Sequence, residues 1–196
     1  MTEKIIIKAE RLTKQFGHFT ATDHITFEVR EGEIFGFLGA NGAGKTTAMR
    51  MLCGLSQPSD GWATVAGYDV ATQHEQVKQN IGYMSQKFSL YDDLTVEENF
   101  TLFGGIYGMS RKEMKEKTTR LLEELDFASE RKTKVKSLPL GWKQKLAFSL
   151  AIFHEPKIVF LDEPTGGVDP VTRRQFWELI YQAADRNITV FVTTHY

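Results

Sequence analysis

The chain has 196 residues, of which 41% are hydrophobic, and it carries 24 Lys and Arg against 25 Asp and Glu. This length supports one domain, or one domain with an inserted subdomain, and a sizeable core. The net charge of −1 gives no reason to expect a nucleic-acid partner or an anionic membrane surface. Because there is no run of 18 apolar residues and no apolar signal-peptide core at the start, we expect a soluble chain in the cytoplasm.

Alternation of apolar and polar residues predicts two half-exposed antiparallel strands at residues 5–12 and 23–29. The segment between them, residues 13–19, is expected to be a polar loop that carries aromatic side chains. Phe16 in this loop either packs at the end of the strand or offers a ring on which a purine base could stack. The residues alone leave both interpretations open.

A glycine-rich loop follows, set between an apolar run at residues 34–38, which predicts a buried parallel strand, and a predicted helix at residues 48–53. The loop has the pattern G-x-x-x-x-G-K-[ST], and its residues are Gly39, Ala40, Asn41, Gly42, Ala43, Gly44, Lys45, Thr46 and Thr47. Such glycines gather backbone N–H groups around a polyphosphate, and the helix N-terminus adds partial positive charge. We expect Lys45 to reach the β- and γ-phosphates and the Thr46 hydroxyl to ligate Mg²⁺. The single cysteine, Cys53, is expected to be a buried structural thiol.

The middle of the chain changes in character at residue 87. Before it, two short strands are predicted at residues 61–67 and 81–84, and the second ends in Gln86, which on local grounds is only a polar loop residue. Residues 87–136 are mainly helical. Thr95 and Glu98 have the form of a capping box, and a second helix follows Ser110. This helical block is a candidate subdomain inserted into an α/β core.

The last third returns to strands. Residues 137–145 predict a proline-glycine turn before an apolar helix at 146–153, and residues 158–161 predict a strand buried on both faces. That strand ends in Asp162 and Glu163 at the edge where α/β proteins bind ligands. In P-loop proteins such an aspartate holds Mg²⁺, and Glu163 is the candidate to deprotonate an attacking water. A helix at 171–185 and a buried strand at 189–193 lead to His195, which emerges at the same edge.

In this order and over nearly the whole length, the motifs resemble those of the ATP-binding subunit of an ABC transporter. The resemblance implies that Phe16 is the A-loop aromatic that stacks on adenine, and that residues 39–47 are Walker A. It makes Gln86 the Q-loop glutamine that contacts Mg²⁺ and the attacking water. It also implies that Asp162 is the Walker B aspartate and Glu163 the catalytic base. His195 would be the switch histidine at the γ-phosphate, and Asp169 would belong to the D-loop. The signature motif would be formed by Leu138, Pro139, Leu140, Gly141 and Trp142.

The fold implied by the resemblance is an α/β P-loop NTPase core with a mixed sheet, N-terminal antiparallel strands and an inserted helical subdomain. Residues 1–86 and 137–196 would form the two parts of the core, and residues 87–136 the helical subdomain. The implied cofactors are ATP and Mg²⁺. Hydrolysis would drive solute export through a membrane-spanning subunit or fused domain, from the inner face of the cell membrane. A second ATP-binding domain would pair head to tail as a homo- or heterodimer. The sequence of the glycine-rich loop is most similar to that of the ABC-2 exporters.

Two departures from that pattern bear on function. The usual signature is Leu-Ser-Gly-Gly-Gln, whereas Pro139 here has neither a hydroxyl nor an N–H, so we expect slow hydrolysis alone or a partner with a fuller signature. The family's fold continues beyond the switch histidine, so we expect a piece of a longer polypeptide. Two other functions stay open: a soluble ABC ATPase acting on ribosomes or chromosomes, and a non-catalytic module in which ATP only holds a dimer together.

Overall fold

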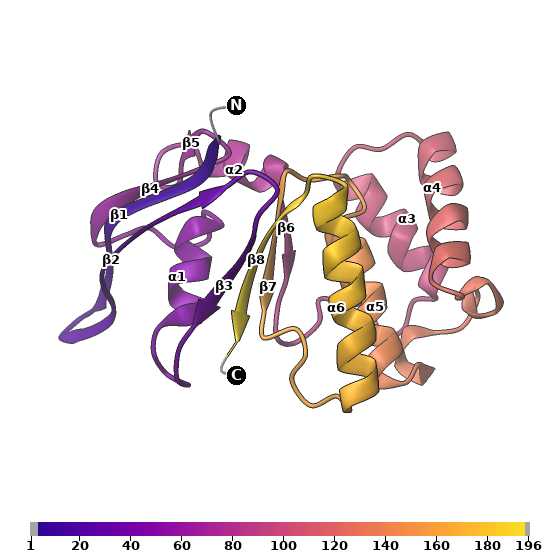
Figure 1. Cartoon of the computed structure of the whole chain (residues 1–196). Helices are drawn as coiled ribbons and strands as arrows, with labels where there is room; N and C mark the ends of the chain where they lie inside the picture. The colour runs from indigo at the N-terminus through magenta and orange to yellow at the C-terminus, as the bar shows by residue number, and fades with distance from the viewer. Residues whose placement is uncertain (1–3, 195–196) are drawn as a thin grey trace.

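Two four-stranded sheets organise the fold, as a computed structural model of the chain shows for residues 4–194 (Figure 1). The strands are β1 (Ile5–Phe16), β2 (Phe19–Arg30), β3 (Ile34–Leu38), β4 (Asp60–Val65), β5 (Tyr68–Asp69), β6 (Ile81–Met84), β7 (Ile158–Asp162) and β8 (Thr189–Thr194). The helices are α1 (Lys45–Leu52), α2 (His74–Asn80), α3 (Val96–Ile106), α4 (Arg111–Glu124), α5 (Leu140–Ala151) and α6 (Pro170–Asp185), with two short 3-10 helices, η1 (Ala128–Glu130) and η2 (Val135–Ser137). The α/β class expected from the sequence is therefore confirmed.

The first sheet is antiparallel in the order β2-β1-β4-β5. Our expectation of a polar loop at residues 13–19 was wrong, because β1 and β2 form one long hairpin whose pairing runs up to Phe16 opposite Phe19. Only two residues make the turn, and Gly17 adopts a φ of 58°, which glycine accepts without strain. The hairpin thereby carries aromatic side chains out to its tip.

The second sheet is parallel in the order β3-β8-β7-β6. The strands that we expected in one mixed sheet are thus divided between an antiparallel and a parallel sheet. In a parallel sheet all strands end at the same edge, so the segments that follow β3, β6 and β7 emerge together. This edge brings the glycine-rich loop, Gln86 and Glu163 into one region.

Helices cover both faces of the parallel sheet. Helix α1 lies between the two sheets and contacts β1, β2, β4 and β7 (Figure 1). Its apolar residues join a buried cluster that includes Met49, Met51 and Cys53. Burial, with a smaller contribution from the Asp162 carboxylate, raises the pKa of the Cys53 thiol, as expected for a structural cysteine. On the other face, α5 and α6 pack against β6 and β8.

The helical block of residues 87–136 forms one end of the molecule, with α3 and α4 beside α5 (Figure 1). Its capping box is confirmed: the Thr95 hydroxyl accepts from the Glu98 N–H at 3.2 Å, and the Glu98 carboxylate accepts from the Thr95 N–H at 2.7 Å. Helix α5 contributes buried apolar residues to two separate hydrophobic clusters. Leu146 and Leu150 pack with the helical block, whereas Phe148 packs with the parallel-sheet core.

The start of α5 differs from our expectation of a turn through residue 145, because the helix begins at Leu140 with Pro139 at its N-cap. Proline is tolerated at a helix start, where its missing N–H has no partner to lose. The segment that we compared with a signature motif therefore forms the first turn of a helix.

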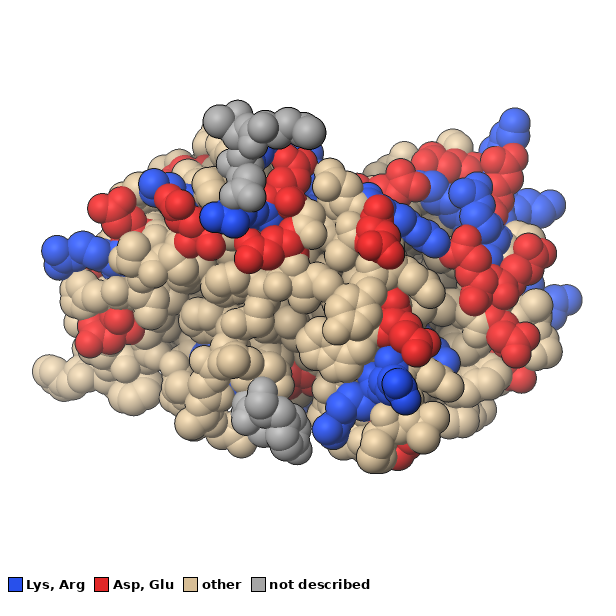
Figure 2. Space-filling view, viewed as in Figure 1, with Lys and Arg blue, Asp and Glu red and all other residues tan. Residues whose placement is uncertain are grey.

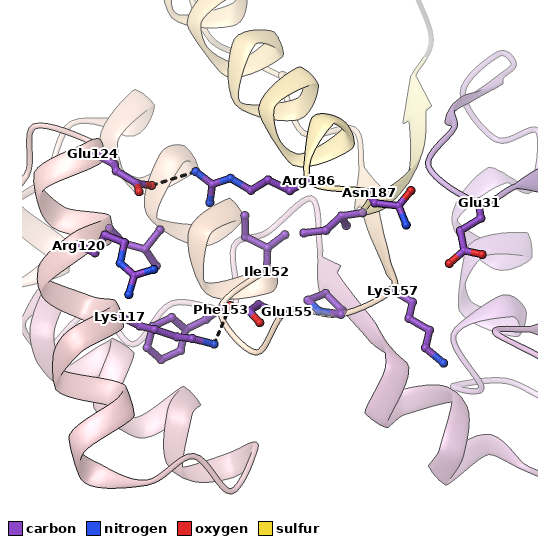
Figure 3. Close-up of a pocket in the computed structure, with 13 residues that line it drawn as sticks. Glu31, Lys117, Arg120, Glu124, Ile152, Phe153, Glu155, Lys157, Arg186 and Asn187 are labelled. Carbon is purple, nitrogen blue, oxygen red and sulfur yellow. Dashed lines mark hydrogen bonds and ion pairs between the residues drawn. The ribbon is translucent and has the colours of Figure 1, made fainter.

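A hollow of about 600 Å³ separates α4 from the ends of α5 and α6 (Figure 3). Two ion pairs cross it, Arg186 to Glu124 at 3.2 Å and Lys117 to Glu155 at 2.9 Å. Figure 2 shows charged side chains gathered over α4 and along the upper rim, with a mainly uncharged middle to this face. Within residues 4–194, none of the helices combines the length and the apolar character that crossing a bilayer requires.

Candidate functional site

A pocket of about 470 Å³ opens where the loops after β3, β6 and β7 meet. Its lining comes from the glycine-rich loop, from the start of α1, from β2 and from the loops after β6 and β7: Asn41, Gly42, Gly44, Lys45, Thr46, Thr47, Phe19, Ala21, Gln86 and Glu163. The sequence predicted most of this set. Phe19, which we expected in a loop, and Ala21, between that loop and the next predicted strand, were missed; both lie in β2.

The glycine-rich loop turns tightly into α1. Gly42 and Gly44 adopt φ values of 80° and 79°, and Gly44 is the N-cap residue of α1. Hairpin strand β2 packs directly against this turn, because a Cβ atom on Gly44 would overlap the carbonyl of Ala21. The first turn of α1 contains no acidic side chain. Its free N–H groups and the positive end of its dipole are thus available to an anion.

Lys45 is 6% exposed although it carries a charge. Its Nζ donates to the carbonyl oxygens of Gly39 at 2.7 Å and Ala40 at 2.9 Å, and it lies 3.6 Å from the Glu163 carboxylate. The ammonium group therefore has two neutral acceptors and one anion. A bound phosphate would compete with Glu163 for this cation.

Asp162 is 3% exposed and accepts hydrogen bonds from two hydroxyl groups. Thr46 donates to its Oδ1 from α1 at 3.2 Å, and Thr193 donates to the same oxygen from β8 at 2.8 Å. Asp162 therefore places a carboxylate, with its electric field, inside the sheet between two neutral donors. The pKa of Tyr83 on the neighbouring strand records this field: burial and the Asp162 charge raise it to about 12.

This donor set suits a hard divalent cation. A carboxylate and a hydroxyl oxygen are ligands that Mg²⁺ accepts, and Mg²⁺ usually keeps several waters beside one or two protein ligands. Asp162 and Thr46, two of the metal ligands that the sequence predicted, lie in direct hydrogen-bond contact in the structure. The residues present therefore fit a magnesium ion at this position.

Gln86 and Glu163 meet across the pocket. The Gln86 Nε2 donates to the Glu163 carboxylate at 3.3 Å, although the two residues are 77 positions apart in the chain. Glu163 leaves the end of β7 with a φ of 47°, in the left-handed region that residues other than glycine seldom occupy. Its backbone N–H donates to the Thr193 hydroxyl at 3.0 Å. A carboxylate, an amide and an ammonium group thus converge at one point.

The segment compared with a signature motif lies outside the pocket. Leu138, Pro139, Leu140 and Gly141 stand at the start of α5, and none of them is among the lining residues. A Cβ atom on Gly141 would lie 2.7 Å from a methyl group of Thr172, so the starts of α5 and α6 pack closely. Asp169 caps α6, and hydrogen bonds from Thr172 lower the pKa of its carboxyl group.

Phe16 is the last residue of β1, at the tip of the hairpin. Phe16 is 55% exposed, with Lys14 Nζ 5.2 Å from its ring, and the pocket is lined by Phe19 from the opposite strand instead. Stacking of a base on Phe16 remains a prediction. His195 lies outside the described residues; the last described residue of β8, Thr194, pairs with Leu38 at the edge where the glycine-rich loop begins.

Comparison with known proteins identifies the relatives of this chain. The sequence model of the ABC transporter family matches residues 22–166. The probable multidrug ABC transporter ATP-binding protein YbhF of Escherichia coli is 50% identical over 97% of this chain. The bacitracin transport ATP-binding protein BcrA of Bacillus licheniformis is 37% identical over the same share. This chain spans 33% of the length of YbhF and 61% of that of BcrA.

Solved structures with the same fold belong to the same class of protein. An ATP-binding subunit of an ABC transporter superposes with a TM-score of 0.85 at 27% identity, over 97% of this chain and 79% of the other. The cbiO1 protein of Clostridium perfringens, part of the complex cbiONQ, superposes with a TM-score of 0.88. At 23% identity, over 99% of this chain and 80% of the other, that second match supports the fold alone.

Proposed function

This chain belongs to the ABC transporter family, and on that premise we propose that it is the ATP-hydrolysing part of an exporter. The observation that supports the proposal best is the convergence of five chemically matched side chains around one pocket: Lys45, Thr46, Gln86, Asp162 and Glu163. They come from separate segments of the chain. Together they supply a cation for phosphate, oxygen ligands for a metal and a base for water.

The proposed reaction begins when the triphosphate of ATP enters the pocket. The loop N–H groups and Lys45 hold the β- and γ-phosphates, which compete with Glu163 for the ammonium group 3.6 Å away. Thr46 and Asp162 would hold Mg²⁺, and a bound ion would supply positive charge to offset the charge that develops on the phosphate oxygens. Glu163 then accepts a proton from a water that Gln86 orients. The water oxygen bonds to the γ-phosphorus as the bond to the ADP oxygen breaks.

The position of α5 supports a dimer as part of the proposal. Its first turn carries Leu140 and Gly141, and neither residue lines the pocket of its own chain. Pairing head to tail would place this turn, with the partial positive charge of its helix N-terminus, against the γ-phosphate of a second ATP-binding domain. Pro139 limits this contact, because it offers neither a hydroxyl nor an N–H.

We further propose the division of the chain that its sequence suggests: residues 1–86 and 137–196 form the nucleotide-binding core, and residues 87–136 form the arm that meets a membrane partner on the cytoplasmic side. The names of two relatives, a multidrug and a bacitracin transporter component, support export of a solute. The protein would then couple closure on ATP to movement of that partner.

The direct test is ATP hydrolysis by the full-length protein and its Glu163→Gln variant, with ATP affinity measured in parallel. We expect the variant to bind ATP as tightly as the wild type and to lose about a hundredfold or more in kcat, since it lacks the base. Glu28→Gln, which breaks the exposed ion pair with Lys8 on the antiparallel sheet, is the matched control. Unchanged turnover in Glu163→Gln would overturn the catalytic assignment. ATP binding without turnover in the wild type would favour the non-catalytic half-site.

A further inference from the structure

The Thr193 hydroxyl joins the two acidic residues of the site, and we propose that Thr193 is a positioning residue for both. The inference rests on the function proposed above. Thr193 is fully buried in β8, where it pairs with Asp162 of β7 on one side and with Phe37 of β3 on the other. It therefore stands in the middle of the parallel sheet, between the strand before the glycine-rich loop and the strand before Glu163.

One hydroxyl group makes two hydrogen bonds whose directions are fixed by chemistry. The Glu163 backbone N–H can only donate, so the Thr193 oxygen accepts from it at 3.0 Å. The hydroxyl hydrogen remains for the Asp162 Oδ1, which lies at 2.8 Å. Aspartate and glutamate are thereby held by the same atom from a neighbouring strand. A hydroxyl group donates and accepts without adding a charge, whereas the side chain of valine, which has the same shape, does neither.

The hydrogen bond to Glu163 occurs where the strand geometry ends. Strand β7 stops at Asp162, and Glu163 turns away with a φ of 47°. Its N–H therefore donates to a side chain instead of continuing the backbone pairing of the sheet. A residue in this region of φ keeps its conformation only when its surroundings enforce it. The Thr193 hydroxyl supplies part of that enforcement, and with it the direction in which the Glu163 carboxylate leaves the chain.

The hydrogen bond from Thr193 to Asp162 adds to one that comes from α1. Thr46 reaches the Asp162 Oδ1 from α1, and Thr193 reaches the same oxygen from β8. Two donors on one oxygen restrict rotation of the carboxylate about its side-chain bonds. Because Asp162 is the candidate metal ligand, its orientation decides how well the cation and the phosphate line up.

The chain offers a matched control four residues earlier on the same strand. Thr189 is also fully buried, and its hydroxyl also accepts from a backbone N–H, that of Gly32 at 2.9 Å. It lies at the opposite end of β8, away from the pocket. Thr189→Val and Thr193→Val therefore remove the same atoms from equally buried places. Only Thr193→Val should disturb the site.

In the full-length protein we expect Thr193→Val to lower kcat for ATP by about ten- to a hundredfold while KM changes by less than about threefold, because ground-state phosphate contacts remain. Thr193→Ser, which keeps the hydroxyl, should stay within about threefold of wild type. Thr189→Val should leave kcat unchanged even where it lowers the thermal unfolding temperature. Equal losses of kcat in Thr189→Val and Thr193→Val, or no loss in Thr193→Val, would overturn the inference.

Residue-resolved hydrogen exchange provides a readout that does not need turnover. The Glu163 amide should exchange at least about tenfold faster in Thr193→Val, and the Gly32 amide should do so in Thr189→Val. A wild type without ATPase activity would refute the proposed function, and the exchange rates would still judge the positioning role. If the Glu163 amide stays protected in Thr193→Val, the hydroxyl does not hold it and the inference fails.

Discussion

Substituting Gly44 by alanine tests the close packing of hairpin strand β2 on the glycine-rich loop. Gly44 has a φ of 79°, which costs an alanine about 1–2 kcal/mol. The new methyl group would also lie 2.9 Å from the carbonyl carbon of Ala21 and 3.1 Å from the Thr22 hydroxyl, and would overlap the Ala21 oxygen. Since the obstacle is backbone, relieving the overlap adds about 1–3 kcal/mol. We expect a total loss of about 2–5 kcal/mol in the free energy of unfolding.

Other glycines with a positive φ separate the cost of the backbone conformation from the cost of the overlap. Gly42 and Gly67 have φ values of 80° and 86°, and a Cβ atom on either would meet no heavy atom within 4 Å. Alanine at Gly67 should therefore cost only the backbone term of about 1–2 kcal/mol and leave ATP affinity unchanged. Urea unfolding curves would give the stability differences, and titration with a fluorescent ATP analogue would give the affinities. Equal stability losses at Gly44 and Gly67 would refute the role assigned to the contact with β2.

Two further predictions concern the start of α5 and the loop after it. Pro139→Ser restores a hydroxyl at the helix start and should raise ATPase activity or dimer affinity by about ten- to a hundredfold; no gain in either would show that the proline is not limiting. Burial lowers the pKa of His154, whose ring stacks on Tyr107 at 3.6 Å and whose Nε2 lies 3.0 Å from the Ile81 carbonyl oxygen. The unfolded state therefore takes up a proton first, near its ordinary pKa of 6.5, and stability should fall as the pH drops through and below that value. We expect the free energies of unfolding of the wild type and His154→Gln to converge as the pH falls from 8 to 5. A constant difference between the two over this range would contradict the prediction.

The sequence predicts the centre of the site well because that centre depends on local geometry. A glycine-rich loop between a strand and a helix has few alternative backbone paths, and an apolar run that ends in Asp162 and Glu163 defines a strand end. Parallel strands share an edge, so the convergence of Lys45, Asp162 and Glu163 follows from pattern alone. In the structure Lys45 lies 3.6 Å from the Glu163 carboxylate, and Thr46, the next residue, donates to Asp162.

Features that depend on pairing between distant segments were harder to predict. Charged and aromatic residues at 13–19 look like a loop until β1 and β2 are paired, and only then does Phe19, not Phe16, reach the pocket. Thr193 was an unremarked polar residue at the end of an apolar run. Its role follows from the register of β8 against β7, which periodicity does not reveal. The start of α5 at Leu140 was not predicted, because a glycine such as Gly141 is typical of turns.

Helix α5 belongs to two apolar cores at once, and this has a mechanical consequence. Its twelve residues span about 18 Å, and its first turn, at Leu140, lies near α6. Its two apolar sides pack against the helical block and against the sheet. Any rotation of the block must either take α5 with it or shear one of two tightly packed surfaces. We therefore expect a rotation of the helical block to move the first turn of α5 at Gly141 as well, with or without a change in the bound ligand.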